Sequence, residues 1–186
     1  MAVQTRAQLQ DDALTITNET IAGANTAARV GGLFDNLADT ATLDRERGIG
    51  SLTIENNTDF TPTINQAVQL VVAMDENILS TYNFSLNKST CEITYTGLDG
   101  APLRVSANIT FSASNNREFE WHIAKDGNIV QSSKADVTMT HNNGHSIYME
   151  AYLVASANEK YSVYVNSINS SQDFTIQSMN FTAVTL

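Results

Sequence analysis

The sequence predicts a mainly β protein, a sandwich of two sheets preceded by a short segment of two helices. Apolar and polar residues alternate along most segments after residue 50, which is the period of a half-buried strand. Only 16% of the 186 residues are charged, so Ser, Thr and Asn supply much of the surface, and this composition favours strands and turns over helices. The chain changes character near residue 48, where Ala, Leu and Asp give way to β-branched and aromatic residues.

The first 43 residues predict two helices. One is expected from about Thr5 to Ala13 and the other from about Thr26 to Leu43. Apolar residues of the second helix follow a spacing that aligns them on one face: Ala27, Val30, Phe34, Leu37 and Ala41. This stripe is too short for a stable isolated coiled coil, so we expect residues 1–43 to lean on another surface or on copies of themselves. Residues 44–50, DRERGIG, are the expected linker.

Residues 51–186 predict about eight to ten short strands with turns at regular spacing, as in sandwiches. The expected strands lie in the following segments: SLTIEN, PTINQAVQLVVAM, STYNFSL, CEITYT, RVSANITFSAS, EFEWHIAK, NIVQSS, SIYMEAYLV, KYSVYVNSI and FTIQSMNFTAVTL. No helical pattern lies among them. Because both faces of these strands need cover, two packed sheets are the expected architecture.

The segment EFEWHIAK raises the question of catalysis because it holds a histidine between carboxylates and a lysine. Its alternation predicts that Trp121 points into the core and that His122 faces solvent or a neighbour. Glu120 shares the face of His122, where we expect an exposed ion pair worth at most about 1 kcal/mol. Asp126 and Gly127 predict a tight hairpin turn. A general base needs a nucleophile in a cleft, and this segment supplies none, so a scaffold role is favoured.

Other residues with chemical potential also favour structural roles. His141 and His145 flank Asn-Asn-Gly, which predicts a turn without a third metal ligand nearby. Cys91 is the only cysteine; this excludes an intramolecular disulfide and favours a buried thiol. We therefore expect no catalytic residue, no metal and no cofactor. The formal net charge of −10 repels phosphate backbones and disfavours nucleic acid. We see no leader peptide and no apolar run of the roughly 18 residues that span a membrane.

Residues 91–186 resemble the jelly roll of tumour-necrosis-factor (TNF)-like and complement-globular-head domains, in the version common on bacteriophage virions. The segments that carry the resemblance are CEITYTG, RVSANITFSAS, EWHIAKDGNIV, YLVASANEKYSVYV and FTIQSMNFTAVTL, and residues 51–90 provide chain for the first strands. One departure is Asn158-Glu159, where the family usually has Gly-Asp before the Y-x-V-x-V strand. Asn tolerates the left-handed backbone that such a turn needs.

The N-terminus resembles the short attachment module that begins many phage fibre proteins. The segments QTRAQLQDD, ITNET and ANTAARVGGLFDNLADT carry this likeness. The two resemblances imply a homotrimer that binds other virion proteins through its N-terminal segment. Tyrosines exposed in a row on strands are unusual for a solvated face and typical of interfaces. The residues expected in the trimer interface are Tyr148, Tyr152, Tyr164, Val30, Phe34 and Leu37.

The resemblance implies a structural role on a virion surface, in a protein made in the host cytoplasm. The first hypothesis is a homotrimeric head or tail fibre or spike that contacts host-surface glycans. The second is a capsid decoration or cementing protein without receptor binding. A third, a small depolymerase, would need an acidic pair across a groove. Amide and imidazole groups in turns suit sugar hydroxyls, although Asn-rich turns also form for backbone reasons alone. The residues expected to contact a receptor are Asn115, Asn116, Arg117, His141, Asn142, Asn143 and His145.

Overall fold

A computed structural model describes most of the chain from Gly48 onward. The described residues are 48–55, 57–72, 79–80, 82–114, 116–140, 144–171 and 173–186. Residues Gly48–Leu186 make up one unit. The expected helices of residues 1–43, with Val30, Phe34 and Leu37, and the linker as far as residue 47 lie outside the described residues.

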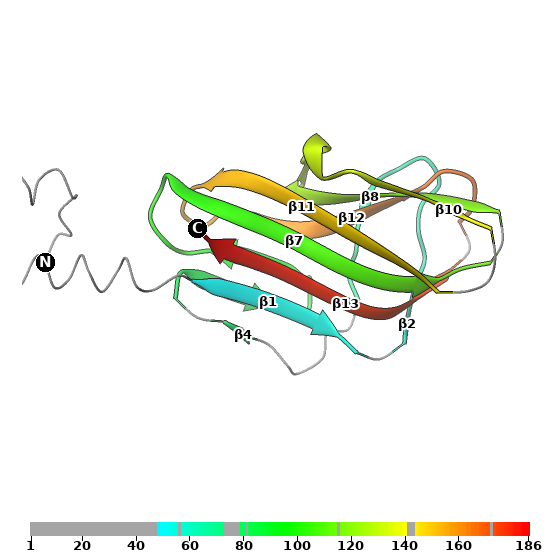
Figure 1. The fold of residues 1–186 in the computed structure, drawn as a ribbon, viewed down its shortest axis with the longest axis horizontal. Helices are drawn as coiled ribbons and strands as arrows, with labels where there is room; N and C mark the ends of the chain where they lie inside the picture. Colours follow the sequence, from blue (N-terminus) through cyan, green and yellow to red (C-terminus); the bar gives the residue numbers. More distant parts are fainter. Residues whose placement is uncertain are drawn as a thin grey trace, which may run out of the picture. The chain divides into compact units, whose positions relative to one another are not determined.

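The described chain forms a sandwich of two antiparallel sheets (Figure 1). The first sheet contains, in spatial order, β11 (His145–Ala155), β7 (Ala101–Ser112), β13 (Phe174–Thr185), β1 (Ile49–Ile54) and β4 (Leu79–Ser80), with β2 (Thr58–Phe60) paired to β13. The second contains β10 (Ala135–Met139), β8 (Arg117–Lys125), β12 (Lys160–Ser167), β6 (Glu92–Tyr95) and β5 (Phe84–Asn87), with β3 (Val68–Gln69) on β12 and β9 (Asn128–Ile129) on β8. Among the described residues, the one helical element is the 3-10 turn Gln131–Ser133.

The long strands run between two ends of the sandwich, which we call proximal and distal. The proximal end holds Gly48 and Leu186, and the backbone N–H of Thr185 donates to the carbonyl of Gly48 at 3.1 Å. The chain therefore enters and leaves the sandwich at the same end (Figure 1). The distal end holds the turn after β7, near Ser114, and the connection between β12 and β13. The C-terminal strand is tied into a sheet, as expected.

Strand prediction succeeded where alternation was long and regular. In β7, Val105, Ala107, Ile109 and Phe111 are all buried while the intervening residues are half-buried or exposed. The hairpin after β8 forms at Asp126 and Gly127, both with positive φ, which is the backbone of a tight two-residue turn. The return strand pairs with β8 over Asn128–Ile129, and after the 3-10 turn β10 resumes the pairing.

Prediction failed between residues 62 and 86. The expected strand at residues 62–74 contains two-residue β3 and an isolated bridge at Ile64. The expected strand at residues 80–86 is divided between β4 and β5, with Tyr82 and Asn83 in a turn between them. Asn83 adopts a φ of 67°, a left-handed conformation that interrupts a strand and that Asn tolerates. β1 begins at Ile49, two residues before the expected start.

Four aromatic rings join the two sheets in the part of the core nearest the distal end. Phe174 of β13 lies 5.7 Å from Phe111 of β7, 5.3 Å from Phe119 and 5.4 Å from Trp121 of β8, between ring centroids. Phe60 of β2 packs on Phe174 at 5.5 Å. These separations are in the range of favourable aromatic pairs. The expected inward orientation of Trp121 is confirmed, since this side chain is fully buried.

The expectation that His122 is an exposed partner of Glu120 was wrong. His122 is only 4% exposed, and it lies directly opposite Tyr164 of the neighbouring strand β12. Its Nδ1 is buried without a hydrogen-bond partner. Glu120 instead bonds Lys134, with 2.6 Å between Oε1 and Nζ. Alternation identified the outward face, but it could not reveal that neighbouring side chains cover this part of that face.

Replacement of the central ring tests the role of the aromatic cluster. We expect Phe174→Ala to lower the free energy of unfolding by about 3–5 kcal/mol, because it removes a large buried side chain and leaves a cavity between the sheets. Leu98→Ala is the control: Leu98 is 72% exposed, so its truncation should cost no more than about 0.5 kcal/mol. Urea unfolding at matched protein concentration measures both. Similar losses in the two variants would contradict the account.

The burial of His122 predicts a dependence of stability on pH. Burial lowers the pKa of His122, the carboxylates of Glu120 and Asp136 oppose this, and the Lys134 ammonium adds to it. The unfolded chain therefore binds a proton at a higher pH than the folded chain. Stability that is present above the unfolded pKa of about 6.5 is lost as the pH falls through the lower folded pKa.

His122→Gln removes this contribution. Its unfolding free energy should fall less than that of the wild type between about pH 7 and pH 5, while carboxylates contribute equally to both curves. Chemical denaturation across this range gives the two profiles. Parallel profiles would show that His122 titrates alike in the folded and unfolded chain.

Candidate functional site

Several connections meet at the distal end. The backbone N–H of Asn116 donates to the carbonyl of Met139 at 2.8 Å. The Nδ2 of Asn169 donates to the carbonyl of Asn116 at 3.0 Å, and its Oδ1 accepts from the N–H of Glu118 at 3.2 Å. These bonds connect the turns after β7, β10 and β12. The turn at Asp126 lies at the opposite, proximal end of β8.

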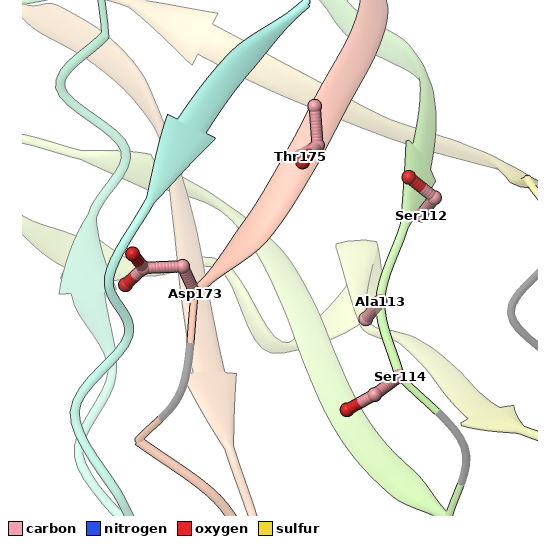
Figure 2. A pocket seen from close by; sticks show the side chains of 5 residues that line it. All are labelled: Ser112, Ala113, Ser114, Asp173 and Thr175. Carbon is pink, nitrogen blue, oxygen red and sulfur yellow. The ribbon is translucent and has the colours of Figure 1, made fainter.

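A polar depression of about 290 Å³ opens beside these turns. Figure 2 shows Ser112 and Thr175 on the neighbouring strands β7 and β13, with Asp173 at the start of β13 and Ser114 just beyond the end of β7. Ala113, which is buried, completes the lining. Four of the five lining side chains therefore carry oxygen, and none is basic or aromatic.

Threonine hydroxyls are hydrogen-bonded to two carboxylates here: Asp173, which lines the depression, and Asp59, which lies beside it. Thr175 Oγ1 donates to Asp59 Oδ1 at 2.6 Å, and Asp59 lies opposite Thr175 across the β2–β13 pair. Thr61 Oγ1 donates to Asp173 Oδ1. An ionised carboxylate has about four acceptor positions, so each Asp keeps acceptor capacity after these bonds. The hydroxyl protons of both threonines are already committed.

The residues expected to contact a receptor differ in their location and exposure. Asn116 stands at the distal end with a φ of 59°. Arg117 is only 4% exposed and its backbone pairs with Met139, so its side chain has little surface for a ligand. His145 begins β11, half-buried, opposite Phe111. The remaining residues of the set, Asn115, His141, Asn142 and Asn143, lie outside the described residues.

No pattern in the sequence identified the residues that line the depression. Ser112 ends a strand that was expected for its alternation, and Asp173 and Thr175 come about sixty residues later in the chain. No motif links them, because the site arises from the pairing of β7 with β13. The signal that sequence does carry is proximity: Ser114 immediately precedes Asn115, which was expected at a receptor contact.

The tyrosines expected in a trimer interface divide between the two sheets. Tyr148 and Tyr152 both stand on the outer face of β11 and are mostly exposed, as is Val154 further along the same face. Tyr148 donates to Glu150 Oε2 at 2.8 Å, and this hydrogen bond raises the pKa of the tyrosine. Tyr164 lies on β12 in the other sheet, half-buried beside His122. Tyr164 thus cannot continue the face of Tyr148 and Tyr152 within one chain.

Large exposed apolar side chains gather at the proximal end. Tyr152 is 62% exposed and Val154 65% exposed. Val154 pairs across to Pro102, whose carbonyl accepts from the N–H of Leu186. Leu98, in the turn before β7, is also exposed. We call Tyr152, Val154, Leu186 and Leu98 the proximal apolar surface. A surface of this kind is typical of a place where a protein meets a partner.

Cys91 has the buried position expected from the sequence. Its Sγ donates to the carbonyl of Val72 at 3.0 Å and accepts from the N–H of the same residue at 3.3 Å. Burial raises the pKa of the Cys91 thiol, which keeps it protonated and weakly reactive. Within the described ranges, no group of three His, Cys, Asp or Glu side chains is arranged to hold a metal ion. No helix in the described part of the chain is long and apolar enough to cross a membrane.

Comparison with known proteins identifies the fold. No model of a known protein family matches the chain, and no curated protein matches it in sequence. The crystal structure of murine APRIL at pH 5.0 matches with a TM-score of 0.52 and 9% sequence identity, covering 76% of this chain and 100% of that chain. APRIL has a TNF-type fold. The described chain is therefore a mainly β sandwich that matches a TNF-like jelly roll, as the sequence predicted.

Proposed function

We propose that the chain is a homotrimeric structural component of a bacteriophage virion, a head or tail fibre or spike that presents its jelly roll to host-surface glycans. One observation carries the proposal: a group of exposed apolar side chains and a polar depression lie at opposite ends of the sandwich. Exposed apolar side chains gather at the proximal end, and oxygen-bearing side chains line the depression at the distal end. This polarity suits a protein attached at one end and exposed to ligands at the other.

The course of the chain supports attachment through the proximal end. Forty-seven residues precede Gly48, and Gly48 lies beside Thr185 near the C-terminus. A partner bound by the N-terminal segment would thus be connected to the sandwich at its proximal end. The distal turns would remain free, since neither end of the described chain leaves from there. Residues 1–43 would supply the contacts to other virion proteins.

The outer face of β11 supports self-association. Tyr148, Tyr152 and Val154 lie on one face of β11, the edge strand of the first sheet, and Glu150 stands between the two tyrosines, hydrogen-bonded to Tyr148. Aromatic residues are enriched in interfaces, whereas charged residues are depleted in interface cores. A trimer of chains that each carry a formal charge of −10 must overcome mutual repulsion, so apolar contact is the natural source of its stability. Tyr164, on the other sheet, would have to meet a different surface of a neighbouring copy.

The alternative function is a capsid decoration or cementing protein without a receptor. It is favoured by one feature of the depression, whose five lining residues include no aromatic side chain on which a sugar ring could stack. This alternative shares the fold, the trimer and the attachment through residues 1–43. It differs in that changes at the distal end would leave adsorption to the host unaltered.

The trimer is tested by mass in solution. Light scattering at micromolar concentration should give three times the 20.2 kDa mass of one chain. The double variant Tyr148→Ser/Tyr152→Ser should weaken association by at least tenfold, which corresponds to about 1.4 kcal/mol, because it removes two aromatic contacts from each copy. Glu118→Gln, at an exposed position of the other sheet, is the control and should remain trimeric. A wild-type monomer would refute the proposal.

Attachment through the N-terminal segment is tested by deletion. Protein lacking residues 1–43 should remain folded and trimeric but should be absent from purified particles, because the deletion removes the expected contacts with other virion proteins. Immunoblotting of particles produced with the full-length or shortened chain measures incorporation. Circular dichroism and light scattering of the shortened chain provide the control for folding. Normal incorporation of the shortened chain would assign attachment to the sandwich itself.

A further inference from the structure

We infer that the distal depression takes a neutral or amine-bearing sugar unit and rejects acidic sugars. This inference rests on the proposed function and adds the chemical class of the ligand. The depression is the space lined by Ser112, Ser114, Asp173 and Thr175 over the buried Ala113, with Asp59 bonded to its Thr175 side. Its volume of about 290 Å³ is at the lower limit of the roughly 300–1,000 Å³ typical of ligand pockets, so it suits a single sugar ring.

The hydrogen-bonding capacity of the depression is biased towards acceptors. Thr175 donates its hydroxyl proton to Asp59, and Thr61 donates its proton to Asp173. Within the lining, the Thr175 oxygen therefore presents lone pairs to a ligand, as do the remaining acceptor positions of the Asp173 carboxylate. Ser112 and Ser114 can donate or accept. A complementary ligand must bring many donors, as sugar hydroxyls do, and an ammonium group brings three.

The negative charge of the depression disfavours acidic sugars. The lining includes the carboxylate of Asp173, and the carboxylate of Asp59 accepts a hydrogen bond from the lining residue Thr175. No Lys or Arg is among the lining residues. A carboxylate, sulfate or phosphate on the ligand would meet like charges at short range. The formal net charge of −10 repels the same ligands during approach. An ammonium group would instead gain charge-assisted hydrogen bonds, which are stronger than neutral ones.

Described residues just beyond the depression are hydrogen-bonded to one another. Beyond Ser114, the carbonyl of Asn116 accepts from Asn169, and the backbone of Asn116 is bonded to Met139. These bonds connect Asn116 to the described part of the connection after β12. Groups that are already hydrogen-bonded lose less conformational entropy when a ligand binds beside them.

The test measures the affinity of the full-length chain for three probes: glucose, glucosamine and N-acetylneuraminic acid. Isothermal titration in EDTA-containing buffer near physiological ionic strength should give glucosamine the highest affinity, glucose a weaker one and N-acetylneuraminic acid none. Asp173→Asn keeps the size of the side chain and removes its charge. It should lower the affinity for glucosamine about tenfold and change that for glucose less than threefold. Ser112→Val should weaken both sugars, because it replaces a hydroxyl of the lining by a methyl group.

Asp136→Asn is the matched control. It removes one carboxylate from an exposed position of the second sheet, and it should leave all three affinities unchanged. Equal affinity for the acidic and neutral probes, or no binding of any probe, would overturn the inference. Binding that is unaltered in Asp173→Asn and Ser112→Val would also overturn it, by moving the sugar elsewhere. Failure of the proposed function is separate, because it appears as absence of the protein from purified particles whatever the sugar result.

Discussion

The contact of Phe174 with rings from both sheets is the interaction on which the rest of the structure depends. Phe174 belongs to the first sheet and packs against Phe119 and Trp121 of the second. The chain crosses repeatedly from one sheet to the other, so neither sheet can bury its inner face by local contacts alone. The aromatic contact holds β13 in register beside β7, and that pairing brings Ser112 next to Thr175. The depression at the distal end is thus a consequence of the core.

The same architecture separates the exposed apolar side chains of the proximal end from the polar depression of the distal end. β1 starts and β13 ends at the proximal end, so both ends of the described chain, Gly48 and Leu186, lie there. The outer face of β11 carries Tyr148, Tyr152 and Val154, with Glu150 between the two tyrosines, whereas the depression is lined by hydroxyls and the carboxylate of Asp173. Each surface has chemistry suited to one kind of contact: dry packing between protein chains at one, and hydrogen bonding to a small polar ligand at the other.

Sequence reasoning succeeded where local chemistry decides the structure. The alternation in β7, the turn at Asp126 and the inward position of Trp121 follow from residue types within a few positions of one another. It failed where the structure depends on contacts between segments that are far apart in the chain. His122 faces outward as its strand predicts, yet Tyr164, forty-two residues later in the chain, lies beside it in the sheet. Asp173 and Ser112 likewise come together because β7 pairs with β13, and no residue spacing in the sequence predicts the depression.

Orientation on the particle tests the central claim most directly, that the proximal end is attached and the distal end is free. Ser114→Cys and Leu98→Cys each introduce one exposed thiol for gold labelling, while native Cys91 is buried. The twelve residues of β7, at about 3.3 Å each, separate the two labels by roughly 40 Å. Electron cryo-microscopy of labelled particles should find the Ser114→Cys label further from the particle surface by about this distance. Equal distances, or a Leu98→Cys label lying further out, would contradict the account.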